Sequence, residues 1–280
     1  MKLKLACADF SFPLLPHEQS LDVISMLGFD GVDIGLFENR GHLQPSAELK
    51  NPALSAAKLA KKLKDRGLRL ADMYLIPATN FNDLAPNHPD ARVRRQAREQ
   101  FRRLVDYTVH AGGRHVSGLP GVFWPREMQI VSQGRSLDEL AWRAAHARDH
   151  GLIYSVEPHI GSIIPSPATA ADLVETVPGL TLTLDYGHFT CGGVPDRAIE
   201  PLIRHASHFH CRGGRKDRLQ ASFKDNAIDF ARVLRVMNRT GYAGYVGVEY
   251  VWVDWQHCNE VDNLSETIHF RDFLRNVKLG

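Results

Sequence analysis

A short apolar run followed by a helical pattern recurs along the whole chain. Between the runs, apolar residues recur at the i, i+3, i+4 and i+7 spacing of a buried helix face, for example from Ala56 to Leu63. Strands that alternate with helices pair in parallel, and eight of them in 280 residues fit a closed (β/α)8 barrel. The sequence therefore predicts an α/β fold with one barrel domain over residues 1–280. The expected strands lie at residues 4–10, 31–37, 68–76, 115–119, 151–157, 180–185, 206–210 and 245–249.

The competing architecture is a doubly wound open sheet. Its dinucleotide-binding form needs a Gly-x-Gly-x-x-Gly motif after the first strand, and the sequence has none there. Two long polar segments, residues 77–89 and 120–135, are expected to be loops at the mouth of the barrel, as lids or as subunit contacts. Ser136 with Glu139 three residues later predicts that the next helix starts at Ser136.

The charge balance and the cysteines limit the class of protein. There are 34 basic and 32 acidic residues, so no overall field favours nucleic acid or an anionic membrane. No apolar run approaches the ~18 residues that span a bilayer, and Asp9 interrupts the N-terminal run before it could form a signal peptide. The four cysteines show no paired motif. We expect a cytoplasmic protein with a small-molecule partner and with neither a nucleic-acid nor a membrane partner; a homo-oligomer, either dimer or tetramer, is left open.

Four consecutive strands are predicted to end in side chains that bind metals. They are Glu157, Asp185, the pair His208 and His210, and Glu249. The period of two puts both histidines on one side of their strand, with His210 level with the acids and His208 one layer deeper. Three carboxylates this close would repel one another, and a divalent cation removes the conflict. Each residue alone has a structural alternative, such as a helix cap, but the set predicts one metal centre.

Oxygen-rich ligation with one imidazole suits Mn²⁺ first, with Mg²⁺, Co²⁺ or Zn²⁺ as alternatives. Other polar and aromatic residues follow the same strand ends. Arg212 and Arg215 lie in a cationic segment that is either a solvated turn or a grip on an acidic substrate. Trp252 is expected to wall the pocket or to pack in the core or in an oligomer, and His159 is expected to line the site.

The motifs Val156-Glu157-Pro158-His159, Leu184-Asp185-Tyr186-Gly187-His188, His208-Phe209-His210 and Val248-Glu249-Tyr250 carry a family resemblance. The chain resembles the sugar phosphate isomerase/epimerase family of xylose-isomerase-like TIM barrels, which includes ketose 3-epimerases, hydroxypyruvate isomerase and inosose dehydratases. The resemblance implies that Glu157, Asp185, His210 and Glu249 bind the metal and that Glu157 and Glu249 are the catalytic acid/base pair. It also implies that His188 reaches the substrate.

Three functions follow as expectations. The first is a metal-dependent isomerase or epimerase of a small sugar, sugar acid or sugar phosphate, with proton transfer through a metal-stabilised enediolate. The second is a dehydratase or lyase on the same site, and the third is a sugar-binding barrel without catalysis. His188 and His208 are expected to hold substrate hydroxyls or to steady a ligand, although for His208 a purely structural role in the core is an equal alternative.

Overall fold

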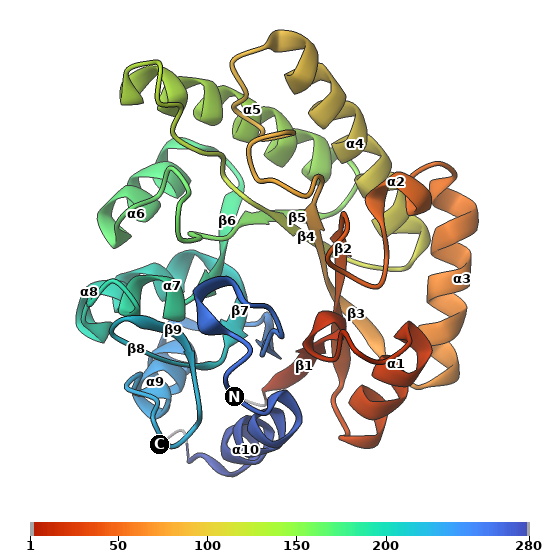
Figure 1. Cartoon of the computed structure of the whole chain (residues 1–280), viewed down its shortest axis with the longest axis vertical. Coiled ribbons are helices and arrows are strands. Elements are labelled where there is room, and N and C mark those ends of the chain that lie inside the picture. The colour runs from red at the N-terminus through yellow and green to blue at the C-terminus, as the bar shows by residue number, and fades with distance from the viewer. Residues whose placement is uncertain (1–2, 279–280) are drawn as a thin grey trace.

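Eight parallel strands form a closed barrel in the computed structural model, which describes residues 3–278 (Figure 1). This confirms the predicted fold class. Around the barrel the strands follow the order β1-β10-β7-β6-β5-β4-β3-β2, and the ring closes where Lys4 of β1 lies opposite Tyr245 of β10. The strands are β1 (Lys4–Ala8), β2 (Gly31–Phe37), β3 (Arg69–Ile76), β4 (His115–Gly118), β5 (Ile153–Val156), β6 (Leu180–Asp185), β7 (Ala206–Cys211) and β10 (Tyr245–Val248).

Helices form an outer ring around these strands (Figure 1). The last helix docks beside the first, where Arg271 donates a hydrogen bond to the carbonyl of Leu27 and Arg275 donates one to that of Gly28. These bonds join the final βα unit to the start of the chain. The helices are α1 (His17–Met26), α2 (Pro45–Glu48), α3 (Pro52–Asp65), α4 (Ala91–His110), α5 (Gln129–Asp149), α6 (Pro167–Thr176), α7 (Gly187–Thr190), α8 (Asp196–Ile199), α9 (Phe230–Thr240) and α10 (Asn263–Asn276). Three short 3-10 turns lie at Asp9–Ser11, Glu200–His205 and Trp255–His257. No helix in residues 3–278 is both long and apolar enough to cross a membrane.

The start of α5 differs from the prediction. The helix begins at Gln129, so Ser136 lies inside it, and the Ser136 hydroxyl donates a 2.5 Å hydrogen bond to the carbonyl of Pro120. The capping-box prediction is wrong because a serine hydroxyl bonds a nearby loop carbonyl as readily as a helix amide. A reciprocal capping interaction does occur at the start of α6, between Ser166 and Thr169.

The segment after β7 is an antiparallel hairpin rather than a plain loop. Its strands are β8 (Gly213–Arg215) and β9 (Arg218–Ala221). The turn between them contains Asp217, which has a left-handed backbone with φ of 62°. The hairpin fixes the backbone on the carboxyl side of Arg212.

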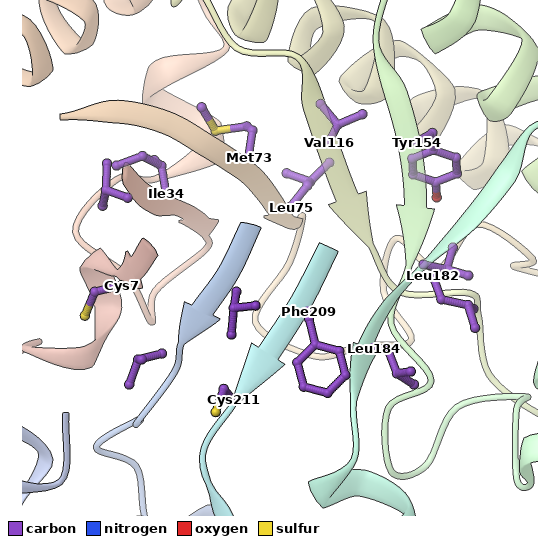
Figure 2. Close-up of a cluster of buried hydrophobic side chains, with 14 of the residues drawn as sticks. Cys7, Ile34, Met73, Leu75, Val116, Tyr154, Leu182, Leu184, Phe209 and Cys211 are labelled. Carbon is purple, nitrogen blue, oxygen red and sulfur yellow. The ribbon is translucent and has the colours of Figure 1, made fainter. Parts of the chain in front are cut away.

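The apolar core lies between the barrel and its helices. Figure 2 shows that every second residue of the strands supplies it, for example Leu182 and Leu184 of β6 and Phe209 of β7. The alternate residues, such as Asp185 and His210, face the barrel interior because successive side chains point to opposite faces of a strand. Strands such as β6 and β7 therefore contribute to packing on one face and present polar groups on the other, whereas β1 and β10 present the small residues Ala6 and Gly247.

Hydrogen bonds between strands satisfy much of the polar interior. Asp33 of β2 lies across the barrel from His208 of β7, with Oδ2 and Nε2 3.1 Å apart. His115 bonds Asp72 through Nδ1 at 2.6 Å and Ser207 through Nε2 at 2.7 Å. His115, Ser207 and His208 line the cavity at the amino-terminal end of the barrel, so these pairs lie below the carboxyl end, where the acids are.

Candidate metal centre

The four predicted metal ligands all lie at the carboxyl end of the barrel and all are buried. Asp185 and His210 are direct partners in the register of β6 and β7. Glu157 follows β5 and Glu249 follows β10. The amide of Glu157 donates a 3.0 Å hydrogen bond to the carbonyl of Gly118, and that of Glu249 donates a 3.1 Å bond to the carbonyl of Cys211, so both residues continue the strand pairing. The parallel strands thus bring residues from four βα units to one level.

Three of these residues form a compact cluster. His210 Nδ1 lies 2.8 Å from Glu157 Oε1 and 3.5 Å from Glu249 Oε2. One ligand atom from each of the three lies within 4.8 Å of the others. Atoms bound to one divalent ion at about 2.0–2.2 Å lie about 3–4.4 Å apart, which is within this limit. Among the described residues, Glu249 Oε2 of this cluster is buried and has no hydrogen-bond partner, so the cluster fits a cation.

Asp185 is engaged by the chain itself. Its Oδ1 accepts a 2.7 Å bond from the amide of Gly187, and its Oδ2 accepts a 2.7 Å bond from Arg212 Nη2. The buried guanidinium of Arg212 also lies 3.5 Å from Glu249 Oε2. A cation at the cluster would therefore share the Asp185 carboxylate with Arg212 or take it over.

Two further histidines border the cluster. His188 accepts a bond from the amide of Ile160 at Nδ1, and its Nε2 lies 3.7 Å from Glu157 Oε2. The ring of His159 is 4.3 Å from that of His188. Burial lowers the pKa of both imidazoles. Both are therefore neutral near pH 7. A neutral imidazole has one nitrogen that donates and one that accepts a hydrogen bond, so each ring can bind a hydroxyl group.

The two glutamates have pKa values shifted in opposite directions. Burial raises the pKa of Glu249 to about 7, more than the charges of His210 and Arg212 lower it. Burial also acts on Glu157, but His188 and His210 outweigh it and hold the pKa of Glu157 far below its usual range. Against the effect of burial, Glu249 and Glu157 raise the pKa of His210 to about 10. In the metal-free protein Glu157 is thus ionised at neutral pH, while Glu249 is partly protonated.

Tyr74 is a site residue that the sequence prediction missed. Its hydroxyl donates a 2.6 Å hydrogen bond to Glu157 Oε2. Burial and the adjacent Glu157 raise the pKa of Tyr74 well above its usual value, so the hydroxyl keeps its proton. The sequence does carry a weak indication, because Asp72 and Tyr74 alternate on β3 and so share its inward face.

The remaining predicted residues divide between the cavity and its surroundings. A cavity of about 100 Å³ opens above the cluster, and Trp252, His159, His188 and Arg212 line it together with the two glutamates. His208 lies below the cavity, bound to Asp33. Arg215 is exposed on the β8–β9 hairpin, where its Nη1 reaches only the carbonyl of Lys216. It does not line the cavity.

A closed β/α barrel with buried acids and imidazoles beside a cavity at its carboxyl end has the architecture of a barrel enzyme. Comparison with family models identifies the family to which this barrel belongs. The chain belongs to the xylose isomerase-like TIM barrel family, whose model matches residues 21–276. The predicted family is thereby confirmed.

Individual relatives are distant. The rhizopine catabolism protein MocC of Rhizobium meliloti is 25% identical over 266 residues, which cover 84% of this chain and 74% of MocC. The structure of an L-ribulose 3-epimerase superposes with a TM-score of 0.77 at 18% identity, covering 98% of this chain and 94% of that one. A xylose isomerase-like barrel of Mycobacterium smegmatis in complex with magnesium superposes with a TM-score of 0.73 at 15% identity. The match covers 99% of this chain and 96% of that one. At these identities the two structures show a shared fold.

Proposed function

We propose that the protein is a divalent-metal-dependent isomerase or epimerase of a small sugar-type substrate. The observation that carries the proposal is the geometry of Glu157 and Glu249, whose carboxylates lie 2.8 and 3.5 Å from His210 Nδ1 and which both line the cavity. Proton transfer between two positions of a substrate needs one group that accepts and one that donates. The likeness to an epimerase and to a magnesium-bound barrel of the same fold supports this choice.

We assign metal ligation to Glu157, His210 and Glu249, with Asp185 as the fourth ligand once Arg212 releases its Oδ2. When bound, a divalent cation such as Mn²⁺ or Mg²⁺ would polarise the substrate carbonyl and acidify the neighbouring C–H bond. Glu157, which is ionised, takes the proton, and Glu249 delivers one to the substrate. Tyr74 holds Glu157 in place through its hydrogen bond, and His159 and His188 hold substrate hydroxyls.

A dehydratase acting on a polyol or sugar acid is the second candidate. The position of both glutamates on the cavity favours it, because one carboxyl group can take the α-proton while the other protonates a departing hydroxyl. The proton acceptor would again be Glu157. Isomerase and dehydratase therefore use the same residues and differ in the fate of the hydroxyl next to the reacting carbon.

The deciding experiment is deuterium exchange from D₂O into a panel of ketoses, sugar acids and cyclic polyol ketones with added Mn²⁺. Incorporation without loss of water identifies an isomerase, and loss of water identifies a dehydratase. Glu157→Gln and Glu249→Gln should each abolish exchange, whereas Glu175→Gln on the exposed surface of α6 should keep it. Full exchange in either active-site variant would refute the two-glutamate mechanism. Binding of sugars with no exchange would leave a non-catalytic barrel.

A further inference from the structure

The cavity at the amino-terminal end of the barrel lies opposite the candidate metal centre. Its volume is about 690 Å³, and strand starts such as Lys4, Arg69 and Tyr245 form much of its wall. This end of a β/α barrel ordinarily contributes to stability rather than to chemistry. His115 and Ser207 nevertheless line the cavity, so an imidazole and a hydroxyl group lie within reach of a ligand there.

Asp72, His115 and Ser207 form a continuous series of hydrogen-bonded side chains. Asp72 Oδ1 lies 2.6 Å from His115 Nδ1, and His115 Nε2 lies 2.7 Å from Ser207 Oγ. These are the connections between a serine nucleophile, a histidine base and an acid that orients the base. The three residues come from β3, β4 and β7, so the closed sheet brings together groups that lie far apart in the sequence.

An irregularity in β7 directs Ser207 toward the interior. Leu182 of β6 pairs with Ala206. The next residue, Thr183, pairs with His208, so Ser207 is the extra residue of a β-bulge. Strict alternation would place Ser207 on the strand face opposite His208, among the residues that pack against the helices. Bulges that redirect one side chain are over-represented next to active sites.

Asp72 is suited to orient the imidazole. Burial raises its pKa, but the charge of His115 and hydrogen bonds from His115 and Ser117 outweigh burial and lower the pKa of Asp72 to about 2. Because Asp72 is ionised, it accepts a hydrogen bond from His115 Nδ1, and the neutral ring then presents the lone pair of Nε2 to Ser207. Thr181 Oγ1 lies 2.6 Å from Ser207 Oγ and helps to fix the position of that hydroxyl.

The wall of this cavity is cationic. Four of its residues carry exposed basic side chains, and they are Lys4, Lys64, Arg69 and Arg114. Among the residues that the structure describes, the lining contains no Asp or Glu. A cavity lined by charge of one sign attracts ligands of the opposite sign. Positive charge near an attacked carbonyl also stabilises the negative charge that develops on its oxygen.

We propose that Ser207 is the nucleophile of a second active site, which hydrolyses esters whose acyl group carries a carboxylate. Ser207 Oγ attacks the ester carbonyl while His115 Nε2 takes its proton, and His115 returns that proton to the departing alkoxide, which leaves as an alcohol. A water molecule, deprotonated by His115, then attacks the acyl group on Ser207. The acid is released and the serine hydroxyl is restored. Asp72 positions the imidazole in both steps, and no metal ion takes part.

Covalent labelling tests the nucleophile directly. A fluorophosphonate should phosphonylate Ser207 with loss of fluoride, as located by peptide mass spectrometry, because an ordinary serine hydroxyl that is not activated by a base does not react. His115→Asn should slow the labelling at least a hundredfold. Ser155→Ala is the matched control, since it removes another interior hydroxyl, one that pairs with Thr183 and with no histidine, and it should leave the labelling unchanged. Absence of label on Ser207 in the wild type, or labelling that does not need His115, overturns the proposal.

Turnover tests the substrate class. The mono-4-nitrophenyl ester of glutaric acid should be hydrolysed at least tenfold faster in kcat/KM than 4-nitrophenyl acetate, and Arg69→Gln with Arg114→Gln should remove this preference. Ser207→Ala, checked for folding by thermal unfolding, should lower kcat/KM at least a hundredfold for both esters. Equal rates for the two esters overturn the preference for anions, and full activity in Ser207→Ala overturns the second site. Hydrolysis should persist in EDTA; its loss there would assign the activity to the metal centre and overturn the second site.

Discussion

Arg212 Nη2 lies 2.7 Å from Asp185 Oδ2, so a cation of the chain itself pairs with the residue predicted as the fourth metal ligand. Both groups are buried. Taking a buried carboxylate from a charged partner is costly unless another cation replaces that partner. If Asp185 is the fourth ligand, as we propose, Arg212 and a bound metal ion compete for its carboxylate.

Arg212→Ala should destabilise the metal-free protein and strengthen metal binding. The unpaired Asp185 carboxylate costs about 3–5 kcal/mol, and saturating Mn²⁺ should restore much of the lost stability. We expect Mn²⁺ to bind at least tenfold more tightly, as measured by calorimetry and by thermal unfolding with and without the ion. The control is Arg215→Ala on the exposed hairpin, which should change stability by less than about 0.5 kcal/mol. Weaker Mn²⁺ binding in Arg212→Ala would argue against the competition.

Metal binding should tighten as the pH rises. In the metal-free protein the pKa of Glu249 is about 7 and that of His210 is about 10, so protons occupy both ligands below pH 7 and only His210 above it. A ligand must lose its proton before it binds a cation. The Mn²⁺ Kd should therefore fall roughly tenfold per pH unit between pH 7 and 9 and more steeply below pH 7.

Calorimetry in buffers of different ionisation enthalpy measures the protons released with each Mn²⁺. Release should be near one proton at pH 8 and should approach two at pH 6. Glu249→Gln, which keeps a neutral side chain of similar size, should remove the extra proton at pH 6. A Kd that does not change with pH would contradict the shifted pKa values.

Tyr74→Phe should slow turnover while leaving the fold intact. A hydrogen bond to a charged group contributes about 1.5–3 kcal/mol, which corresponds to roughly tenfold to hundredfold in rate if it positions Glu157, the proton acceptor that we propose. We expect kcat in the deuterium-exchange assay to fall by that factor, with a much smaller change in KM. Tyr154→Phe is the matched control, because Tyr154 packs against Phe101 in the outer core. Equal loss in both variants would mean that the Tyr74 hydroxyl has no special role.

Gly247→Ala should be strongly destabilising. A Cβ at this position would lie 2.1 Å from Asp33 Oδ2 and 3.2 Å from His208 Nε2, so the buried pair would have to separate. We expect a loss of at least about 2 kcal/mol in urea unfolding. Gly134→Ala in α5 meets no atom within 4 Å and should instead stabilise by about 0.5–1 kcal/mol. Wild-type stability in Gly247→Ala would show that the interior adjusts more freely than its packing implies.

The fold was predictable because the hydrophobic pattern of each βα unit lies within that unit's own sequence. Alternation on β6 and the helical stripe from Ala56 to Leu63 need no knowledge of distant residues. The start of α5 was not predictable, because the Ser136 hydroxyl bonds the loop carbonyl of Pro120 and does not cap a helix. That choice depends on where the preceding loop lies in space.

The candidate site was predictable where strand ends alone define it. The period of two on β7 places His210 beside Glu157 and places His208 one layer deeper, beside Asp33, as expected. Partners across the barrel were not predictable, since Asp33 and His208 are 175 residues apart and Asp33 sits inside its strand rather than at the end. The pairing of Arg212 with Asp185 was also missed, because strand alternation stops where the hairpin begins.

The alternation on β6 has an evolutionary consequence. Leu182 and Leu184 hold the barrel to its helices, whereas Thr183 and Asp185 face the interior. Residues that fold the chain and residues that define its chemistry are thus interleaved one by one along the same short segment. During evolution the inward-facing residues can be substituted, and the reaction can change, while the outward-facing residues keep the packing between barrel and helices.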